Sequence, residues 1–99
     1  MAIHGYLGAQ CKLGAMYWHG DGVTQNERSA ILWYEKAARQ GNAVAQRNLA
    51  EVYRTLANMR FSTREEFYKK AVEWYLEAAS QGEERAKLRL RELRRGKKG

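Results

Sequence analysis

The sequence contains no proline, a single cysteine and only two histidines among its 99 residues. The lack of proline, together with 44% hydrophobic residues, is unlike a collagen-like or disordered chain and predicts one small folded domain. The single Cys11 excludes an intramolecular disulfide bond and agrees with a reducing compartment. No apolar run approaches the roughly 20 residues of a membrane-spanning helix, so we expect no membrane partner. The first ten residues also lack the basic and apolar segments of a signal peptide, which predicts a cytoplasmic location.

The net charge of +7 is concentrated near the C-terminal end. Residues 1–84 contain 10 Lys and Arg against 10 Asp and Glu, whereas residues 85–99 contain 8 Lys and Arg against Glu92 alone. We therefore expect any attraction to an anionic partner to act mainly through this end of the chain.

The sequence repeats itself with a period of about 40 residues. Residues 9–17 match residues 45–53 after a shift of 36, and residues 30–41 match residues 71–82 after a shift of 41. The difference is a five-residue insertion between Tyr53 and Ala71, and an incomplete third copy begins at Gly82. A period in this range is typical of solenoid proteins, in which each unit packs against its neighbours.

Within each unit the small and apolar residues recur every three or four positions, which predicts helices. We expect five, near residues 6–18, 26–40, 42–58, 63–81 and 83–95, arranged as antiparallel pairs. Asn26 and Asn42 can each cap a helix start. The pairs Thr24 with Glu27, and Ser62 or Thr63 with Glu65 or Glu66, also have capping-box spacing.

These markers resemble the Sel1-like repeats, relatives of the tetratricopeptide repeats. The family pattern A-x-x-x-L-G-x-x-Y-x-x-G-x-G-V, followed by A-x-x-W-Y-x-K-A-A-x-x-G, is met in the first unit by Ala9, Leu13, Gly14, Tyr17, Gly20, Gly22, Val23, Ala30, Trp33, Tyr34, Lys36, Ala37, Ala38 and Gly41. The second unit lacks the Gly-x-Gly-Val turn and has a longer connection over residues 54–62. The resemblance implies an all-α fold, a short right-handed α-solenoid of two and a half repeats in one domain, 1–99. Its parts are repeat 1 (about 6–41), repeat 2 (about 42–82), a basic capping helix (83–95) and a disordered tail (96–99).

Two residue classes are expected to build this fold. Small residues let helices approach closely, and the Trp-Tyr pairs fill the space between successive helix pairs. Glycines can adopt the positive φ of a turn or a helix end. The residues assigned these structural roles are Gly20, Gly22, Trp33, Tyr34, Gly41, Trp74, Tyr75 and Gly82.

Signals of catalysis or ligand chemistry are weak. The Gly20-Asp21-Gly22 segment follows a helix and lacks a later Gly-Lys-Ser/Thr, which favours a turn over a phosphate loop. Cys11 and His19 lie about two helical turns apart, too far to share a metal ion without other ligands, and His4 does not complete a set. Because Cys11 also lacks an evident base, we expect no enzyme activity, no cofactor and no metal ion.

The better candidate site is the outward stripe of the first helix of each unit. It contains Lys12, Arg47, Asn48, Glu51, Arg54, Arg85, Arg89 and Glu92. In Sel1-like and tetratricopeptide proteins this face lines a concave groove that holds a partner. The resemblance thus implies a protein-protein interaction module, an adaptor of the bacterial type or an inhibitor-type binder, while a merely solvated face is the alternative.

The basic C-terminal segment has three interpretations: a cap that keeps the array end soluble, a site for an acidic partner, or a nucleic-acid-binding helix. Its cations are Arg85, Lys87, Arg89, Arg91, Arg94, Arg95, Lys97 and Lys98. Nucleic-acid binding through this helix is the alternative function, although the aromatic residues are committed to the core rather than available for base stacking. Self-association of the chain through its repeat ends is also left open.

Overall fold

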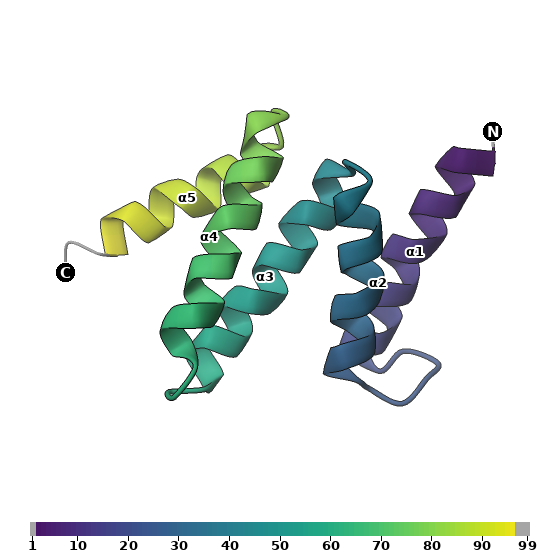
Figure 1. Cartoon of the computed structure of the whole chain (residues 1–99), viewed down its shortest axis with the longest axis horizontal. Helices are drawn as coiled ribbons and strands as arrows, with labels where there is room; N and C mark the ends of the chain where they lie inside the picture. The colour runs from purple at the N-terminus through teal and green to yellow at the C-terminus, as the bar shows by residue number, and fades with distance from the viewer. Residues whose placement is uncertain (1, 97–99) are drawn as a thin grey trace.

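The computed structural model describes the backbone of residues 2–96 and the side chains of residues 8–94. Its helices are α1 (Ala2–His19), α2 (Glu27–Arg39), α3 (Ala43–Met59), α4 (Arg64–Ser80) and α5 (Glu84–Gly96), shown in Figure 1. No strand occurs among the described residues. Helix α1 begins four residues earlier than predicted, and the other boundaries differ by one residue. The predicted disordered tail is wrong at Gly96, which ends α5, and residues 97–99 lie outside the described residues.

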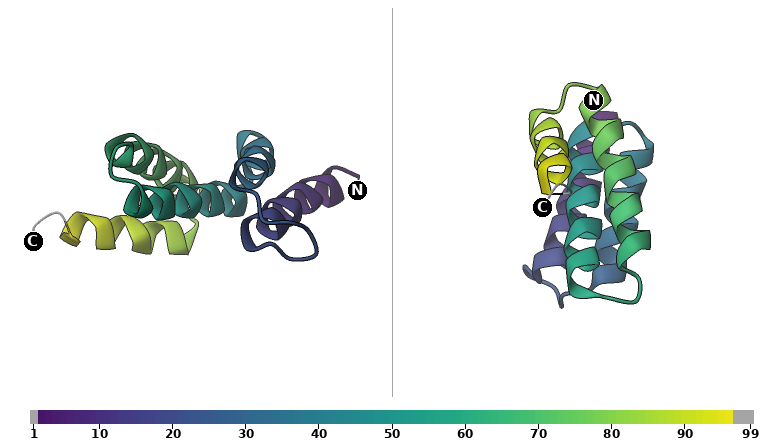
Figure 2. Two further views of the ribbon diagram at one scale, coloured as in Figure 1. Left: turned by 90° about the horizontal axis from the view of Figure 1, so that it is seen from below. Right: turned by 90° about the vertical axis from the view of Figure 1, so that its left-hand side faces the viewer.

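The helices form two layers. Figure 2 shows α1, α3 and α5 on one side of the molecule and α2 and α4 on the other. The shortest extent of the backbone is 18 Å, which fits two layers of helices packed about 8–10 Å apart. Within each repeat the two helices run antiparallel, α1 against α2 and α3 against α4 (Figure 1). This arrangement confirms the predicted helical solenoid and makes α1, α3 and α5 equivalent elements of successive units.

Local polar contacts fix where the helices start and stop. The side chain of Asn26 accepts a hydrogen bond from Ser29 N, and that of Asn42 accepts one from Ala45 N, so both predicted caps form. The start of α4 differs, because Thr63 makes no side-chain cap bond. The four glycines assigned to turns and helix ends all have positive φ: Gly20, Gly22, Gly41 and Gly82.

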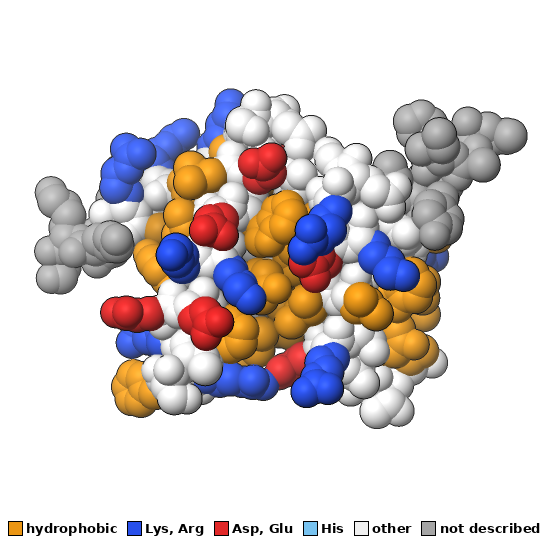
Figure 3. All heavy atoms as spheres, in the orientation of Figure 1, with side chains coloured by type: hydrophobic (Ala, Val, Ile, Leu, Met, Phe, Trp, Pro, Cys, Tyr) orange, Lys and Arg blue, Asp and Glu red, His pale blue; other side chains and the backbone are white. Residues whose placement is uncertain are grey.

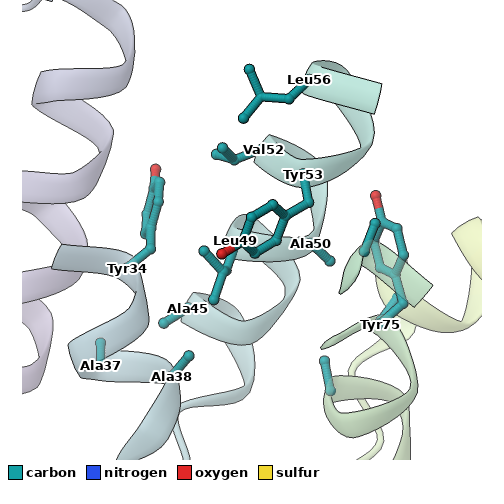
Figure 4. Packing of buried hydrophobic residues seen from close by; sticks show 13 residues of the cluster. Tyr34, Ala37, Ala38, Ala45, Leu49, Ala50, Val52, Tyr53, Leu56 and Tyr75 are labelled. Atoms are coloured by element: carbon teal, nitrogen blue, oxygen red, sulfur yellow. The ribbon is translucent and has the colours of Figure 1, made fainter. Parts of the chain in front are cut away.

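Tyrosines and small residues form the core, shown in Figure 4. Tyr75, Leu49 and Leu56 are the largest fully buried side chains, and Tyr34 is only 4% exposed. Alanines occupy many of the remaining core positions, including Ala37 and Ala38 of α2 and Ala45 and Ala50 of α3. Because an alanine side chain is short, neighbouring helices approach closely enough for a tyrosine ring to fill the space between them.

The two members of each Trp-Tyr pair are buried to different extents. Trp33 and Trp74 are half-buried, whereas Tyr34 and Tyr75, one residue later in each helix, are buried. One residue corresponds to about 100° around a helix, so the tyrosine points between the paired helices while the tryptophan lies at the rim. The Trp33 ring is covered there by the ammonium group of Lys36, 4.9 Å from its centroid.

Helix α1 is less buried than its equivalent in the second unit. Ala9 is exposed and Leu13 and Tyr17 are half-buried, although the equivalent residues of α3 (Ala45, Leu49 and Tyr53) are buried. Helix α3 makes extensive contact with both α2 and α4, whereas α1 packs extensively only against α2 among the described helices. The same sequence pattern is therefore buried in the second unit and half-covered in the first.

A glutamine pair joins the two helices of each repeat at the same place. Gln40 donates to Gln10 across 2.9 Å in the first repeat, and Gln81 donates to Gln46 across 2.8 Å in the second. Gln46 also donates to the carbonyl oxygen of Ala38, so this buried amide links the second repeat to the first. Hydrogen bonding offsets the desolvation of the buried Gln10 and Gln46 side chains and fixes the relative position of the helices.

Candidate functional site

The layer formed by α1, α3 and α5 contains a hollow of about 440 Å³, which we call the inner groove. It lies across α3, between the C-terminal end of α1 and the first turns of α5, on the side of the molecule where Figure 2 shows these three helices together. Its lining residues are Trp18, His19, Tyr34, Arg47, Asn48, Glu51, Val52, Arg85, Leu88 and Arg89. The first helices of three units, together with Tyr34 of α2, thus contribute side chains to one surface.

A chain of ion pairs connects α3 to α5 along the groove. The carboxylate of Glu51 accepts a hydrogen bond from Arg54 (Nη2 to Oε1, 3.2 Å) and another from Arg89 (Nε to Oε2, 2.9 Å). Arg89 continues to Glu92 of the same helix, with Nη1 2.9 Å from Oε1. Arg54 also donates through Nε to the hydroxyl of Tyr75 across 3.3 Å, which ties the chain to the core.

These contacts keep Glu51 ionised. Burial alone would raise the pKa of its carboxyl group, but the hydrogen bonds and positive charges of Arg89 and Arg54 outweigh burial and lower that pKa. The hydrogen bonds that Arg89 donates, to Glu51 first and then to Glu92, raise the pKa of its guanidinium group. Both charges therefore persist at neutral pH, and the bridge between α3 and α5 holds the groove walls in position.

A second contact fixes the first turn of α5. One oxygen of Glu83 accepts a hydrogen bond from Ala86 N (2.7 Å) and so caps the helix, while the other accepts from Arg47 Nε (3.2 Å). Arg47 also donates to the side chain of Asn48 across 3.0 Å. A half-buried ion pair between α3 and the residue before α5 thus orients the groove face of the last helix.

The predicted site residues are only partly brought together. The inner groove is lined by five of the eight: Arg47, Asn48, Glu51, Arg85 and Arg89. Arg54 lies beyond Glu51 as its ion-pair partner, and Lys12 is exposed on α1 outside the groove lining. Glu92 pairs with Arg89 but lines a different hollow, between α4 and α5.

The sequence reasoning missed the apolar wall of the groove, formed by Trp18, Val52 and Leu88. Leu88 occupies the position in α5 that Arg47 occupies in α3, one of the outward positions already identified, and the repeat shift alone could have found it. It is 49% exposed. Trp18 occupies the position of Arg54, and no periodic signal singles it out.

The opposite layer has a different character. Figure 3 shows this α2/α4 face, where hydrophobic side chains between the two helices are surrounded by charges of both signs. A hollow of about 410 Å³ lies there, lined by Glu35, Arg39, Tyr53, Lys70, Glu73, Trp74 and Glu77. Glu35 and Arg39 already pair with each other (Oε2 to Nη2, 2.6 Å). Of the three hollows described, only the inner groove has more cationic than anionic side chains in its lining, three arginines against one glutamate.

Other candidate chemistries find little support in the described part of the chain. No group of three or more His, Cys, Asp or Glu residues gathers there around a common point. Cys11 is half-buried and accepts a long contact of 3.5 Å from the side-chain amide of Asn48. The Gly20-Asp21-Gly22 segment forms the turn between α1 and α2, with the backbone N–H groups of Gly20 and Asp21 bonded to Met16 O. None of the described helices is both long and apolar enough to cross a bilayer.

Known proteins resemble this chain in sequence and structure. A sequence profile of the Sel1 repeat matches residues 7–42 and 64–83, more than half of the chain. Over 55 residues the chain is 44% identical to chitin synthase regulatory factor 3 of Schizosaccharomyces pombe, covering 54% of this chain and 6% of that protein. The crystal structure of a Sel1 repeat protein from Oxalobacter formigenes matches with a TM-score of 0.69 and 37% identity, covering 87% of this chain and 61% of the other. The chain thus spans less than two thirds of either protein.

Proposed function

Because the chain belongs to the Sel1 repeat family, whose repeats are generally protein-interaction modules, we propose that it binds a partner protein through the inner groove. The observation that carries this proposal is the convergence of α1, α3 and α5 on one hollow with an apolar wall and charged side chains. Clefts that combine apolar contact area with a few placed polar groups are the usual form of a binding site.

The mechanism we infer is passive. The ion pairs of Glu51 with Arg89 and of Arg47 with Glu83 hold the groove walls in place before a partner arrives, so little ordering has to accompany binding. Apolar contact with Trp18 and Leu88 supplies affinity, and the charged rim supplies selectivity and association rate. A regulatory relative is compatible with either an adaptor or an inhibitor-type binder, and in both roles binding rather than catalysis is the contribution of the chain.

The proposal is tested by capturing partners from the source cell with the intact chain and with two matched variants. Leu88→Glu places a charge on the apolar wall of the groove, and Leu76→Glu places the same charge on α4, outside it. The two leucines are similarly exposed, 49% and 55%. We expect a partner retained by wild type and Leu76→Glu and lost from Leu88→Glu. Equal capture by all three proteins, or loss from both variants alike, contradicts binding in the groove.

A second candidate function is nucleic-acid binding through α5. Arg91 and Arg94 are exposed and form no ion pair with any side chain that the structure describes. Phosphate contacts by such cations weaken steeply as salt rises. A titration with duplex and single-stranded DNA and RNA from 50 to 200 mM salt tests this candidate, and no binding at the low-salt end removes it.

A further inference from the structure

The positive charge of the inner groove is concentrated on α5. Arg85 and Arg89 are four residues apart, so they project from the same side of the helix, and both line the groove. The equivalent positions of α3 are uncharged, Val44 and Asn48. The last helix therefore turns a groove that would otherwise be mostly neutral into a cationic one.

The carboxylates along the groove do not neutralise all of this positive charge. Glu51 and Glu92 together balance Arg54 and Arg89, and Glu83 balances Arg47. Arg85 is exposed and pairs with no carboxylate among the described side chains. Arg89 is 38% exposed at its side chain and retains guanidinium N–H groups beyond those in its two pairs. The free donors thus lie on the α5 wall.

The apolar part of the groove lies next to these donors. Leu88 sits between Arg85 and Arg89 in the sequence of α5 and is half exposed into the groove, with Trp18 and Val52 contributing from α1 and α3. A ligand that fills the groove therefore meets a cationic wall and an apolar wall together. A bare anion would contact only the cationic wall. An apolar or basic segment would remove water from Arg85 without supplying a carboxylate to pair with it.

We propose that the inner groove recognises a linear peptide segment in which an aspartate or glutamate stands beside a large apolar residue. The carboxylate pairs with Arg85 and Arg89, and the apolar side chain packs on Leu88 and Trp18. Charge-assisted hydrogen bonds from a guanidinium fork to a carboxylate are the strong and directional kind, which makes this pair the basis of specificity. The inference rests on the proposed function and specifies the chemistry of its partner.

The test uses a displayed library of random 12-residue peptides selected against the full chain, followed by fluorescence polarisation with the enriched peptide. We expect enrichment of Asp or Glu adjacent to Leu, Ile, Phe or Trp. Replacing the acidic residue by its amide should weaken binding about tenfold or more, because the charge is lost at constant shape. Arg85→Glu should weaken binding by a similar factor, and a peptide carrying Lys in place of the acid should recover binding to that variant.

The matched control is Arg91→Glu, which makes the same charge change on an exposed residue of α5 outside the groove lining. Binding to this variant should stay within about twofold of wild type, since Arg91 does not line the groove and charges at exposed positions interact weakly through solvent. An equal loss in Arg91→Glu would mean a general charge effect and would overturn the inference. Correct folding of each variant is checked by its helical circular dichroism and urea midpoint.

The outcomes separate the inference from the proposed function. Enriched peptides that are neutral or basic, yet are lost with Leu88→Glu, overturn the acidic specificity and leave groove binding standing. Enriched peptides that bind Arg85→Glu and Leu88→Glu as well as wild type overturn both. A selection that enriches no peptide overturns recognition of a linear segment, while capture of a folded partner through Leu88 would still support the groove.

Discussion

At the scale of single residues, Gly14 of α1 lies directly against the ring of Tyr34 in α2. A Cβ atom placed there would lie 2.8–2.9 Å from three ring atoms of Tyr34, a side chain that is buried between the helices. We expect Gly14→Ala to lower the free energy of unfolding by about 1–3 kcal/mol, because the ring has little room to move. Gly8→Ala in the same helix meets nothing within 4 Å and should raise stability by up to about 1 kcal/mol. Urea denaturation measures both, and a stable Gly14→Ala would contradict the packing.

The buried tyrosines predict a loss of stability at high pH. Burial, the dominant cause in both cases, raises the pKa of the Tyr34 and Tyr75 hydroxyl groups to about 12 from an ordinary value of 10.0. Between these values the unfolded chain releases protons that the folded chain keeps, so the free energy of unfolding falls as pH rises. The slope is about 1.4 kcal/mol per pH unit for each tyrosine. Urea unfolding from pH 9 to 12 measures it.

The control for this pH dependence is Phe in place of each tyrosine. Tyr34→Phe and Tyr75→Phe should each flatten the profile above pH 10 relative to wild type, since the titrating hydroxyl is gone. Tyr75→Phe should also cost stability at neutral pH, because Arg54 loses the hydroxyl that accepts its Nε hydrogen bond. If the free energy of unfolding of both variants falls with pH as steeply as that of wild type, other groups cause the loss of stability at high pH.

At the scale of the helix, the starts of α3 and α4 should respond differently to the loss of a polar side chain. Asn42→Ala removes the hydrogen bond to Ala45 N and should lower stability by about 1 kcal/mol. Thr63 makes no cap bond, and its buried hydroxyl oxygen has no hydrogen-bond partner among the described residues, so Thr63→Ala should be neutral or stabilising. Thermal and urea unfolding of the two variants compares them directly, and equal losses would contradict this assignment of caps.

Helix positions could be predicted from the sequence because periodicity and capping residues are local signals. The Asn26 and Asn42 caps and the glycine helix ends follow from a few neighbouring residues. Glu83 was missed as the cap of α5, because its carboxylate is also held by Arg47, which lies 36 residues earlier in the sequence. The burial of Tyr34 instead of Trp33 also depends on which neighbour each helix face meets, and a 3.6-residue period does not contain that information.

At the scale of the whole molecule, the order of the repeats explains which site residues could be found. The outward stripe of α1, α3 and α5 follows from the repeat shift, and five of the eight residues predicted from it line the inner groove. Lys12 falls outside because the hollow lies at the C-terminal end of α1, at Trp18 and His19, and Lys12 is near the middle of that helix. Where a groove begins and ends depends on the angles between successive helices, which only the assembled structure provides.

Comparing α5 with α3, position by position, also indicates whether two chains can associate through α5. Three positions that are buried in α3, at Gln46, Ala50 and Tyr53, correspond in α5 to Lys87, Arg91 and Arg94. All three cations are exposed. A second copy that packed its own α5 against this face would bring like charges together, which is strongly unfavourable at close range. The surface of α5 outside the groove therefore opposes pairing of two chains at this end.

Restoring the α3 residues on α5 should reverse this effect. We expect wild type to sediment as a monomer at about 50 µM and the triple variant Lys87→Gln, Arg91→Ala, Arg94→Tyr to form dimers or larger species, because it removes three charges and exposes an apolar face. The control Lys12→Gln, Arg28→Ala, Lys69→Gln removes three exposed cations from α1, α2 and α4 without adding an apolar face, and it should remain monomeric. Analytical ultracentrifugation over a concentration series decides the matter: a triple variant that stays monomeric, or a wild type that already dimerises through α5, would mean that charge on this helix does not govern association.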